Sequence, residues 1–158
     1  MNENLVIAYK VVSRDQFTDE MKILEKVALE VATKAYAPYS HFSVGAAALL
    51  DNGEIVVGSN QENAAYPSGI CAERTCLFHA GAIYPESAVK SLLVLAINAK
   101  GERAQCASPC GACRQVLLEV SDRFKQPFKV YLPGEDSAIV LDDNRSLLPF
   151  GFVASNMH

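Results

Sequence analysis

The sequence predicts an α/β protein, a three-layer α/β/α sandwich in which one mixed sheet of five strands lies between layers of helices. Three observations lead to this prediction. First, segments with apolar residues at helical spacing alternate with short strand-like runs. Second, an Asn-Gly pair joins two of these strand-like runs. Third, another strand-like run is apolar without alternation, as in a strand that is covered on both faces. The expected order of elements is helix, hairpin, helix, strand, helix, strand, strand.

The first helix is expected between Thr18 and Ala37. Thr18 suits an N-cap, and Asp19 and Glu20 follow it where the helix dipole favours negative charge. Pro38 disfavours helical geometry in the residue before it, so the helix should end by Ala37. Its apolar face is predicted from six residues that recur at helical spacing: Ile23, Leu24, Val27, Ala28, Val31 and Ala35.

A β-hairpin is predicted from residues 42–50 and 54–59. The pair Asn52-Gly53 lies between these runs, and both residue types tolerate the positive φ angles of tight hairpin turns. Residues 45–48 (GAAA) are small for a strand. We therefore expect a helix or a ligand to pack closely against this part of the sheet.

The remaining elements follow in a regular order. Residues 90–98 are apolar without alternation, which predicts a central strand covered on both faces. Residues 5–12 form either a short edge strand or an ordered arm. The other expected elements are a loop over 60–70, a helix over about 72–83, a helix whose first turn contains Pro109, and short strands over 128–132 and 138–141.

Length and composition indicate a single domain over residues 1–158, with residues 1–17 as an N-terminal extension to which no role is assigned. The formal net charge of -4 argues against a broad nucleic-acid surface. No secretory signal is apparent, and no run approaches the roughly 20 apolar residues of a membrane helix. Five clustered cysteines favour metal ligation over a disulfide framework. A cytoplasmic protein is expected.

The chemistry is concentrated in the segments Cys71-Ala72-Glu73 and Pro109-Cys110-Gly111-Ala112-Cys113. Cys71, Cys110 and Cys113 have metal-ligand spacing, and three thiolates leave one tetrahedral position of a zinc ion open. Glu73 is a carboxylate that is free to move protons to and from a water held there. These residues predict a catalytic zinc site.

Local geometry and charge refine this prediction. Cys110 and Cys113 are one helical turn apart, whereas Cys71 and Glu73 converge only if Cys71 lies just before a helix or in its distorted first residue. Three thiolates and one zinc ion carry a net negative charge, so a neighbouring cation would restore the Lewis acidity of the metal. Arg74 is the expected cation, and Arg114 and Gln115 are further candidates for supporting the ligands.

These residues resemble a known family. Cys-Ala-Glu followed by Pro-Cys-x-x-Cys is similar to the zinc deaminase signature, in the variant with cysteine in place of histidine. Segments 38–47 (PYSHFSVGAA) and 58–67 (GSNQENAAYP) also resemble the small homotetrameric cytidine deaminases. The resemblance covers residues 35–152.

The resemblance implies hydrolytic deamination of cytidine and 2′-deoxycytidine to uridine and 2′-deoxyuridine, as in pyrimidine salvage, with one Zn²⁺ in each subunit. Water activated by zinc attacks the ring carbon that bears the amino group. Glu73 takes the proton from water, protonates the adjacent ring nitrogen and finally helps ammonia to leave.

The resemblance also implies how the nucleoside binds. Backbone groups around Ala64 and Ala72 hold the edge of the base, and Phe42 packs beside the pyrimidine. Asn60 and Glu62 correspond to the pair that binds the ribose 3′-hydroxyl. An aromatic residue of the C-terminal tail closes the cleft of a neighbouring subunit, and both Phe150 and Phe152 are candidates for this role.

Two other functions remain open from the residues alone. A fourth cysteine, Cys106, would allow a closed four-cysteine structural zinc site in a non-catalytic interaction domain, although Glu73 would then have no role. Alternatively, the substrate is another aminopyrimidine, such as a nucleoside antibiotic or a polynucleotide. Cys76 and Cys106 are interpreted as small core or loop residues, and Tyr66 as a residue that shapes its loop.

Overall fold

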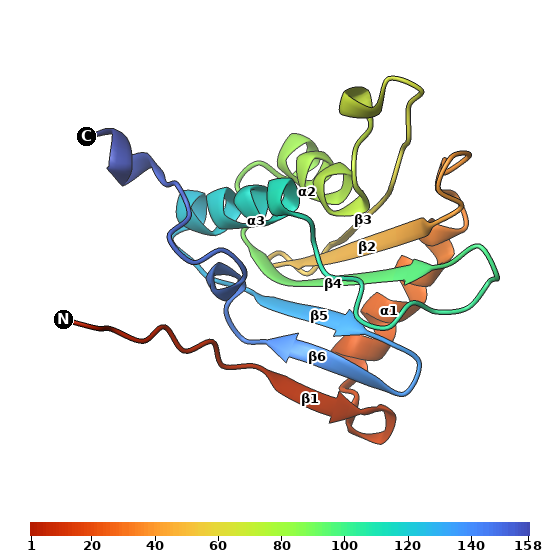
Figure 1. Ribbon diagram of the computed structural model, residues 1–158, viewed down its shortest axis with the longest axis horizontal. Helices are drawn as coiled ribbons and strands as arrows, with labels where there is room; N and C mark the ends of the chain where they lie inside the picture. The colour runs from red at the N-terminus through yellow and green to blue at the C-terminus, as the bar shows by residue number, and fades with distance from the viewer.

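The computed structural model describes residues 1–158 and shows one mixed sheet between two layers of helices (Figure 1). The strand order is β1-β6-β5-β4-β2-β3, and only β4 and β5 are parallel neighbours. The predicted three-layer α/β/α fold is confirmed. The bounds are β1 Lys10–Ser13, α1 Asp19–Ala32, β2 Ser43–Leu50, β3 Ile55–Ser59, α2 Ala72–Ile83, β4 Val89–Ile97, α3 Gly111–Phe124, β5 Lys129–Pro133 and β6 Ser137–Leu141.

The sheet has six strands, so the prediction of five was wrong. The additional strand is β1, which overlaps the edge strand given above as one of two alternatives for residues 5–12. It pairs antiparallel with β6 at the edge of the sheet, from Lys10 opposite Val140 to Ser13 opposite Ser137. Only these four residues of the N-terminal extension join the sheet, and residues 1–9 are exposed. A sequence pattern identifies an apolar run, but it does not show whether a pairing partner lies beside that run.

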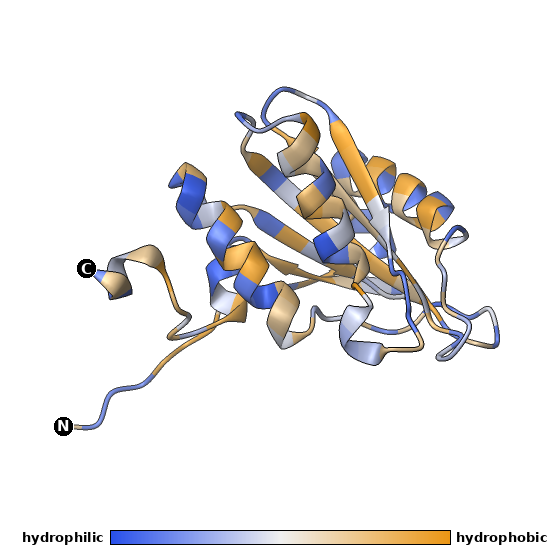
Figure 2. Ribbon diagram, turned by 90° about the horizontal axis from the view of Figure 1, so that it is seen from above, coloured by the Kyte–Doolittle hydropathy of each residue, from blue (hydrophilic) through white to orange (hydrophobic).

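Each face of the sheet has its own hydrophobic core. Helix α1 covers one face, where Leu24 and Ala28 pack against Leu93 and Leu95 of β4. Helices α2 and α3 cover the other face, where Leu77 and Leu117 belong to a second buried cluster. Strand β4 contributes to both cores, which confirms the predicted central strand. Figure 2 shows both chain ends extending from the same side of this body.

The helix boundaries follow the predicted signals closely. The side chain of Thr18 accepts a hydrogen bond from Met21 N at 3.2 Å, as expected for an N-cap. Helix α1 ends at Ala32, five residues before the predicted limit. Its buried side includes Met21. Ile23 is 53% exposed and Ala35 lies beyond the end of the helix, so their predicted places on the apolar face were wrong. No helix of the chain has the length and apolar character needed to cross a membrane.

Two glycines allow helices to approach the hairpin closely. A Cβ atom on Gly45 would lie 1.9 Å from the carbonyl oxygen of Ala28, so the close packing expected at residues 45–48 is made by α1. A Cβ atom on Gly58 would lie 2.3 Å from Cys76 N and 2.8 Å from Ala72 O. The first turn of α2 therefore rests directly on the backbone of β3.

Candidate active site

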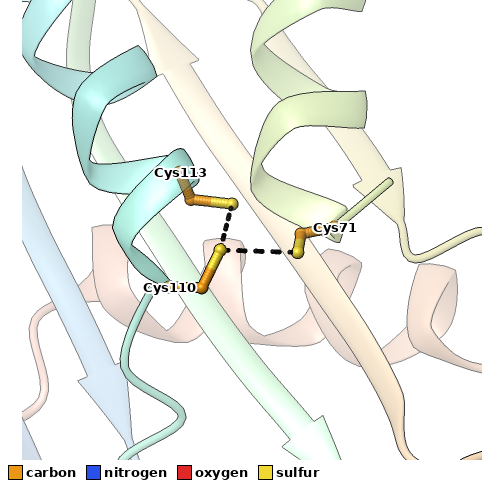
Figure 3. Close-up of side chains that lie close together, drawn as sticks. All are labelled: Cys71, Cys110 and Cys113. Atoms are coloured by element: carbon orange, nitrogen blue, oxygen red, sulfur yellow. Dashed lines mark hydrogen bonds between the residues drawn. The ribbon is translucent and has the colours of Figure 1, made fainter. Parts of the chain in front are cut away.

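Three cysteines from two helix N-termini meet on one face of the sheet (Figure 3). Cys71 is the N-cap of α2 and Cys110 the N-cap of α3, while Cys113 lies in the first turn of α3. The Sγ atoms of Cys71 and Cys110 are 3.7 Å apart, and those of Cys110 and Cys113 are 3.5 Å apart. Cys71 thus lies immediately before a helix, as its spacing from Glu73 predicted.

The geometry of the cluster fits a zinc ion. Tetrahedral zinc with sulfur ligands at about 2.3 Å places those sulfurs about 3.8 Å from one another. All three Sγ atoms lie within 4.8 Å of each other, and Cys106 is not part of this cluster. A closed four-cysteine site is therefore excluded in this arrangement. The three thiolates would hold a zinc ion and would leave one of its four positions free for a water molecule.

The surroundings of the cluster favour thiolates. Hydrogen bonding from Cys113, and then from Arg74 and Cys110, lowers the pKa of Cys71 to about 5 in spite of partial burial. The same contact with Cys71, together with burial, raises the pKa of Cys113. The cluster therefore holds one thiolate readily at neutral pH. The charge of a bound divalent cation allows the other thiols to lose their protons.

Arg74 is the cation nearest to the ligands. Its Nη2 donates to Cys71 Sγ at 3.9 Å, and its Nε is buried without a hydrogen-bond partner. Arg114 and Gln115 were also predicted to support the ligands, but their hydrogen bonds go to backbone carbonyl groups. Arg114 donates to Pro109 O at 2.8 Å and to Leu147 O at 3.0 Å, and Gln115 donates to Phe152 O at 2.8 Å. Arg114 thereby supports the backbone just before Cys110, while Gln115 holds the C-terminal tail.

Glu73 is the buried carboxyl group beside the cluster. It lies in the first turn of α2, is only 4% exposed and lines the cleft described below. Burial, and next the neighbouring negative charge of Cys71, raise the pKa of Glu73. A carboxyl group whose pKa is raised toward neutrality both accepts and returns a proton at moderate energetic cost.

A cleft of about 1030 Å³ opens in front of these groups, at the upper end of the usual range for small-molecule sites. Of the residues predicted to bind substrate, Phe42, Asn60 and Glu62 line it, whereas Ala64 and Ala72 do not. Most of the other wall residues were not assigned from the sequence, because nothing in their local pattern places them here; they include Tyr39, Tyr66, Val94, Ala107 and Ser108. Cys106 also lines the cleft. Tyr39 and Tyr66 meet edge to face with ring centroids 6.1 Å apart.

Asn60 and Glu62 tie together the two segments beside the cleft. Asn60 Oδ1 accepts from Val44 N at 2.8 Å, and its Nδ2 donates to Phe42 O at 2.9 Å. Glu62 accepts from the backbone of Tyr39 at 2.9 Å, from the backbone of Ser40 and from the Ser40 hydroxyl. The hydrogen bond from Ser40 lowers the pKa of Glu62, so this carboxylate is ionised at neutral pH.

The two tail aromatics lie outside the cleft of their own chain. Phe150 is 99% exposed with a φ angle of 56°, and Phe152 is 58% exposed. Neither residue lines the cleft.

Cys76 and Cys106 were both predicted to be small core or loop residues. Cys76 is fully buried and its thiol donates to Val56 O at 3.2 Å, which confirms a core position.

The α/β/α fold and an open three-thiolate centre beside a buried carboxyl group define the class of zinc-dependent hydrolytic deaminases. Residues 19–125 match a family model described as the cytidine and deoxycytidylate deaminase zinc-binding region, and the chain belongs to this family. The predicted family, its zinc cofactor and its enzymatic character are thereby confirmed.

Individual relatives agree with this assignment over nearly their whole length. A cytidine deaminase of Halalkalibacterium halodurans is 37% identical over 139 residues, which cover 88% of this chain and 98% of the relative. A crystal structure of cytidine deaminase from Burkholderia pseudomallei superposes with a TM-score of 0.70 at 37% identity, covering 86% of this chain and 100% of that one. A crystal structure of cytidine deaminase from Mycobacterium tuberculosis gives a TM-score of 0.65 at 30% identity, covering 87% and 99%.

Proposed function

We propose that this protein hydrolyses cytidine and 2′-deoxycytidine to uridine and 2′-deoxyuridine with release of ammonia. The observation that carries the proposal is the open three-cysteine centre beside buried Glu73, in a cleft of nucleoside size. The full-length similarity to cytidine deaminases supports the same substrate class. Salvage of pyrimidine nucleosides in the cytoplasm fits five free cysteines, which a reducing compartment preserves.

Cys71, Cys110 and Cys113 hold the zinc ion, which supplies Lewis-acid activation of water when bound. Glu73 accepts a proton from the attacking water and transfers it to the ring nitrogen next to the reacting carbon. It then passes the second water proton to the departing amino group, so that ammonia leaves and the carboxylate is regenerated. Burial of Glu73 keeps bulk water from competing for these protons.

The residues around the cleft give the nucleoside its orientation. Phe42 packs beside the pyrimidine, and backbone groups around Ala64 and Ala72 hold the edge of the base. Asn60 donates and Glu62 accepts hydrogen bonds at the 3′-hydroxyl of the sugar, which is both a donor and an acceptor. The Asn60 amide retains one N–H after its contact with Phe42, which supports this role. A site of this kind favours free nucleosides over a polynucleotide linked through its 3′ oxygen.

Assembly into a homotetramer completes the proposal. Phe78 and Ile83 on the outer side of α2 are 53% and 50% exposed, and Phe150 projects from the tail. Large exposed apolar side chains of this kind are typical of subunit contacts. Phe150 or Phe152 then closes the cleft of a neighbouring subunit. Light scattering at micromolar concentration is expected to give four chains, and a monodisperse monomer would contradict this assembly.

One assay tests the proposed reaction directly. Loss of cytidine absorbance is followed with purified protein whose zinc content is measured in parallel. We expect about one zinc per chain and turnover of cytidine and 2′-deoxycytidine, with none of 3′-linked cytosine oligonucleotides. Full zinc occupancy without turnover of any cytosine nucleoside refutes the activity, and faster turnover of oligonucleotides or of another aminopyrimidine refutes the substrate.

A further inference from the structure

The N-terminal extension is connected to a wall of the cleft. Residues 1–18 lie outside the region that matches the family model, which begins at residue 19. Residues 98–109, here called the cleft loop, join β4 to α3 and contribute Cys106, Ala107 and Ser108 to the cleft wall. Figure 1 shows this loop and the β5–β6 turn beyond the same end of the sheet.

The connection begins at Arg14, which lies in the 3₁₀ turn after β1. Its Nη1 lies 2.6 Å from a carboxylate oxygen of Glu25 on α1. The same guanidinium donates to two carbonyl groups of the β5–β6 turn, Glu135 O at 2.5 Å and Gly134 O at 2.9 Å. It also lies over the ring of buried Phe17, 4.8 Å from the centroid. Arg14 therefore joins the extension to both α1 and the β5–β6 turn.

Glu25 connects this arrangement to the cleft loop. Its second carboxylate oxygen accepts from the guanidinium of Arg103, and both side chains are largely buried, at 12% and 14% exposure. One carboxylate thus lies between two guanidinium groups, Arg14 from the extension and Arg103 from the cleft loop. Because the group is poorly solvated, loss of one partner is costlier than loss of an exposed ion pair.

A second contact joins the β5–β6 turn to the same loop. A Cβ atom on Gly134 would lie 2.1 Å from Oε1 of Gln105, so the Gln105 side chain rests directly on the backbone that Arg14 holds. The next residue, Cys106, has a φ angle of 49° in the left-handed region and lines the cleft. A non-glycine residue keeps this conformation only where its surroundings hold it.

We propose that Arg14 is a positioning residue which, through Glu25 and the β5–β6 turn, holds the cleft loop in the conformation that binds the nucleoside. The extension thereby acquires a role in the reaction without touching the substrate. The effect on nucleoside affinity rests on the proposed deaminase activity, whereas the effect on loop order does not. Arg14 and Glu25 lie outside the cleft lining, so their replacement leaves the zinc ligands and Glu73 in place.

The test compares Arg14→Ala, Arg14→Lys and Glu25→Gln with the control Lys10→Ala. Lys10 lies in the same extension and forms an ion pair with Asp142, but both side chains are more than half exposed. Hydrogen–deuterium exchange over residues 98–109 is measured alongside KM, kcat and zinc content. We expect Arg14→Ala and Glu25→Gln to speed exchange in this loop and raise KM, each by about tenfold. Zinc content and kcat should stay near wild type.

The control and the conservative variant distinguish positioning from general destabilisation. Lys10→Ala should leave loop exchange and KM unchanged, and Arg14→Lys should recover only the Glu25 contact, giving an intermediate KM. Wild-type exchange in residues 98–109 of both Arg14→Ala and Glu25→Gln overturns the proposal. Faster loop exchange with unchanged KM overturns its link to binding. A protein that lacks deaminase activity but shows the exchange change refutes the proposed function alone.

Discussion

The contact between β3 and α2 leads to a prediction for Gly58→Ala. The new methyl group would lie 2.3 Å from Cys76 N and 2.8 Å from Ala72 O, and both are backbone atoms. No side-chain rotation relieves such a contact, so either α2 or the edge strand β3 must move. The first turn of α2 follows Cys71 directly, and Asn60 follows the end of β3 directly.

The size of the effect follows from these distances. Non-bonded heavy atoms settle at about 3.5 Å, so helix and strand must separate by about 1 Å. Overpacking of this kind costs about 1–3 kcal/mol, which for a chain of this length lowers the melting temperature by about 2–12 °C. Zinc–ligand distances agree with their standard values to within about 0.2 Å, so a shift of about 1 Å in a ligand disturbs the site. If α2 moves, we expect zinc affinity to fall by about tenfold or more; if β3 moves, KM rises instead.

Gly45→Ala provides the matched control for this measurement. Its methyl group would lie 1.9 Å from Ala28 O, so it forces β2 and α1 apart on the opposite face of the sheet. Both variants are compared by thermal unfolding, by zinc competition with a chelating dye and by cytidine kinetics. Gly45→Ala should lose stability but keep its zinc affinity. Wild-type zinc affinity together with wild-type KM in Gly58→Ala would refute the reasoning.

Three further predictions concern the site itself. Glu73→Gln keeps the shape of the side chain but cannot move protons, so kcat should fall by a factor of about 10²–10⁴ with zinc content unchanged. A kcat near that of the wild type would disprove the proton-transfer role. Glu62→Ala should raise KM for cytidine without loss of zinc, and unchanged kinetics would remove Glu62 from the sugar site. Removal of zinc by a chelator should abolish turnover and lower the melting temperature, and re-addition should restore both; activity that survives at zero zinc would rule out the metal.

Elements defined by local signals were predicted well from the sequence. Helix α2 spans the predicted residues 72–83, and its buried residues Ala72, Cys76, Leu77 and Ala80 recur at helical spacing, which is a local feature. The N-cap at Thr18 and the central strand β4 were predicted for the same reason. The zinc ligands were found because thiol spacing at helix starts is itself a local pattern.

Features that depend on distant partners were not predictable in this way. Strand β1 exists because β6 offers an unpaired edge, which its own four residues do not reveal. Met21 is buried and Ile23 exposed because the orientation of α1 on the sheet is decided by its fit to Gly45 and the neighbouring strands. Arg14, Glu25 and Arg103 meet only after residues far apart in the chain have folded together.

The topology of the sheet explains why the metal and the sugar-binding pair lie in one cleft. Strands β3 and β4 are each antiparallel to β2, so they run in the same direction. Each is followed by a connection and then by a helix on the same face, α2 or α3. The connections 60–71 and 98–110 therefore leave the same end of the sheet, where open α/β sheets place their ligands. One connection carries Asn60, Glu62 and Cys71, and the other carries the cleft loop and Cys110. A change that shifts Cys71 or Cys110 is therefore expected to weaken zinc binding, and a change that shifts the rest of either connection should weaken nucleoside binding. A change at the contact between α1 and β2, such as Gly45→Ala, should affect stability alone.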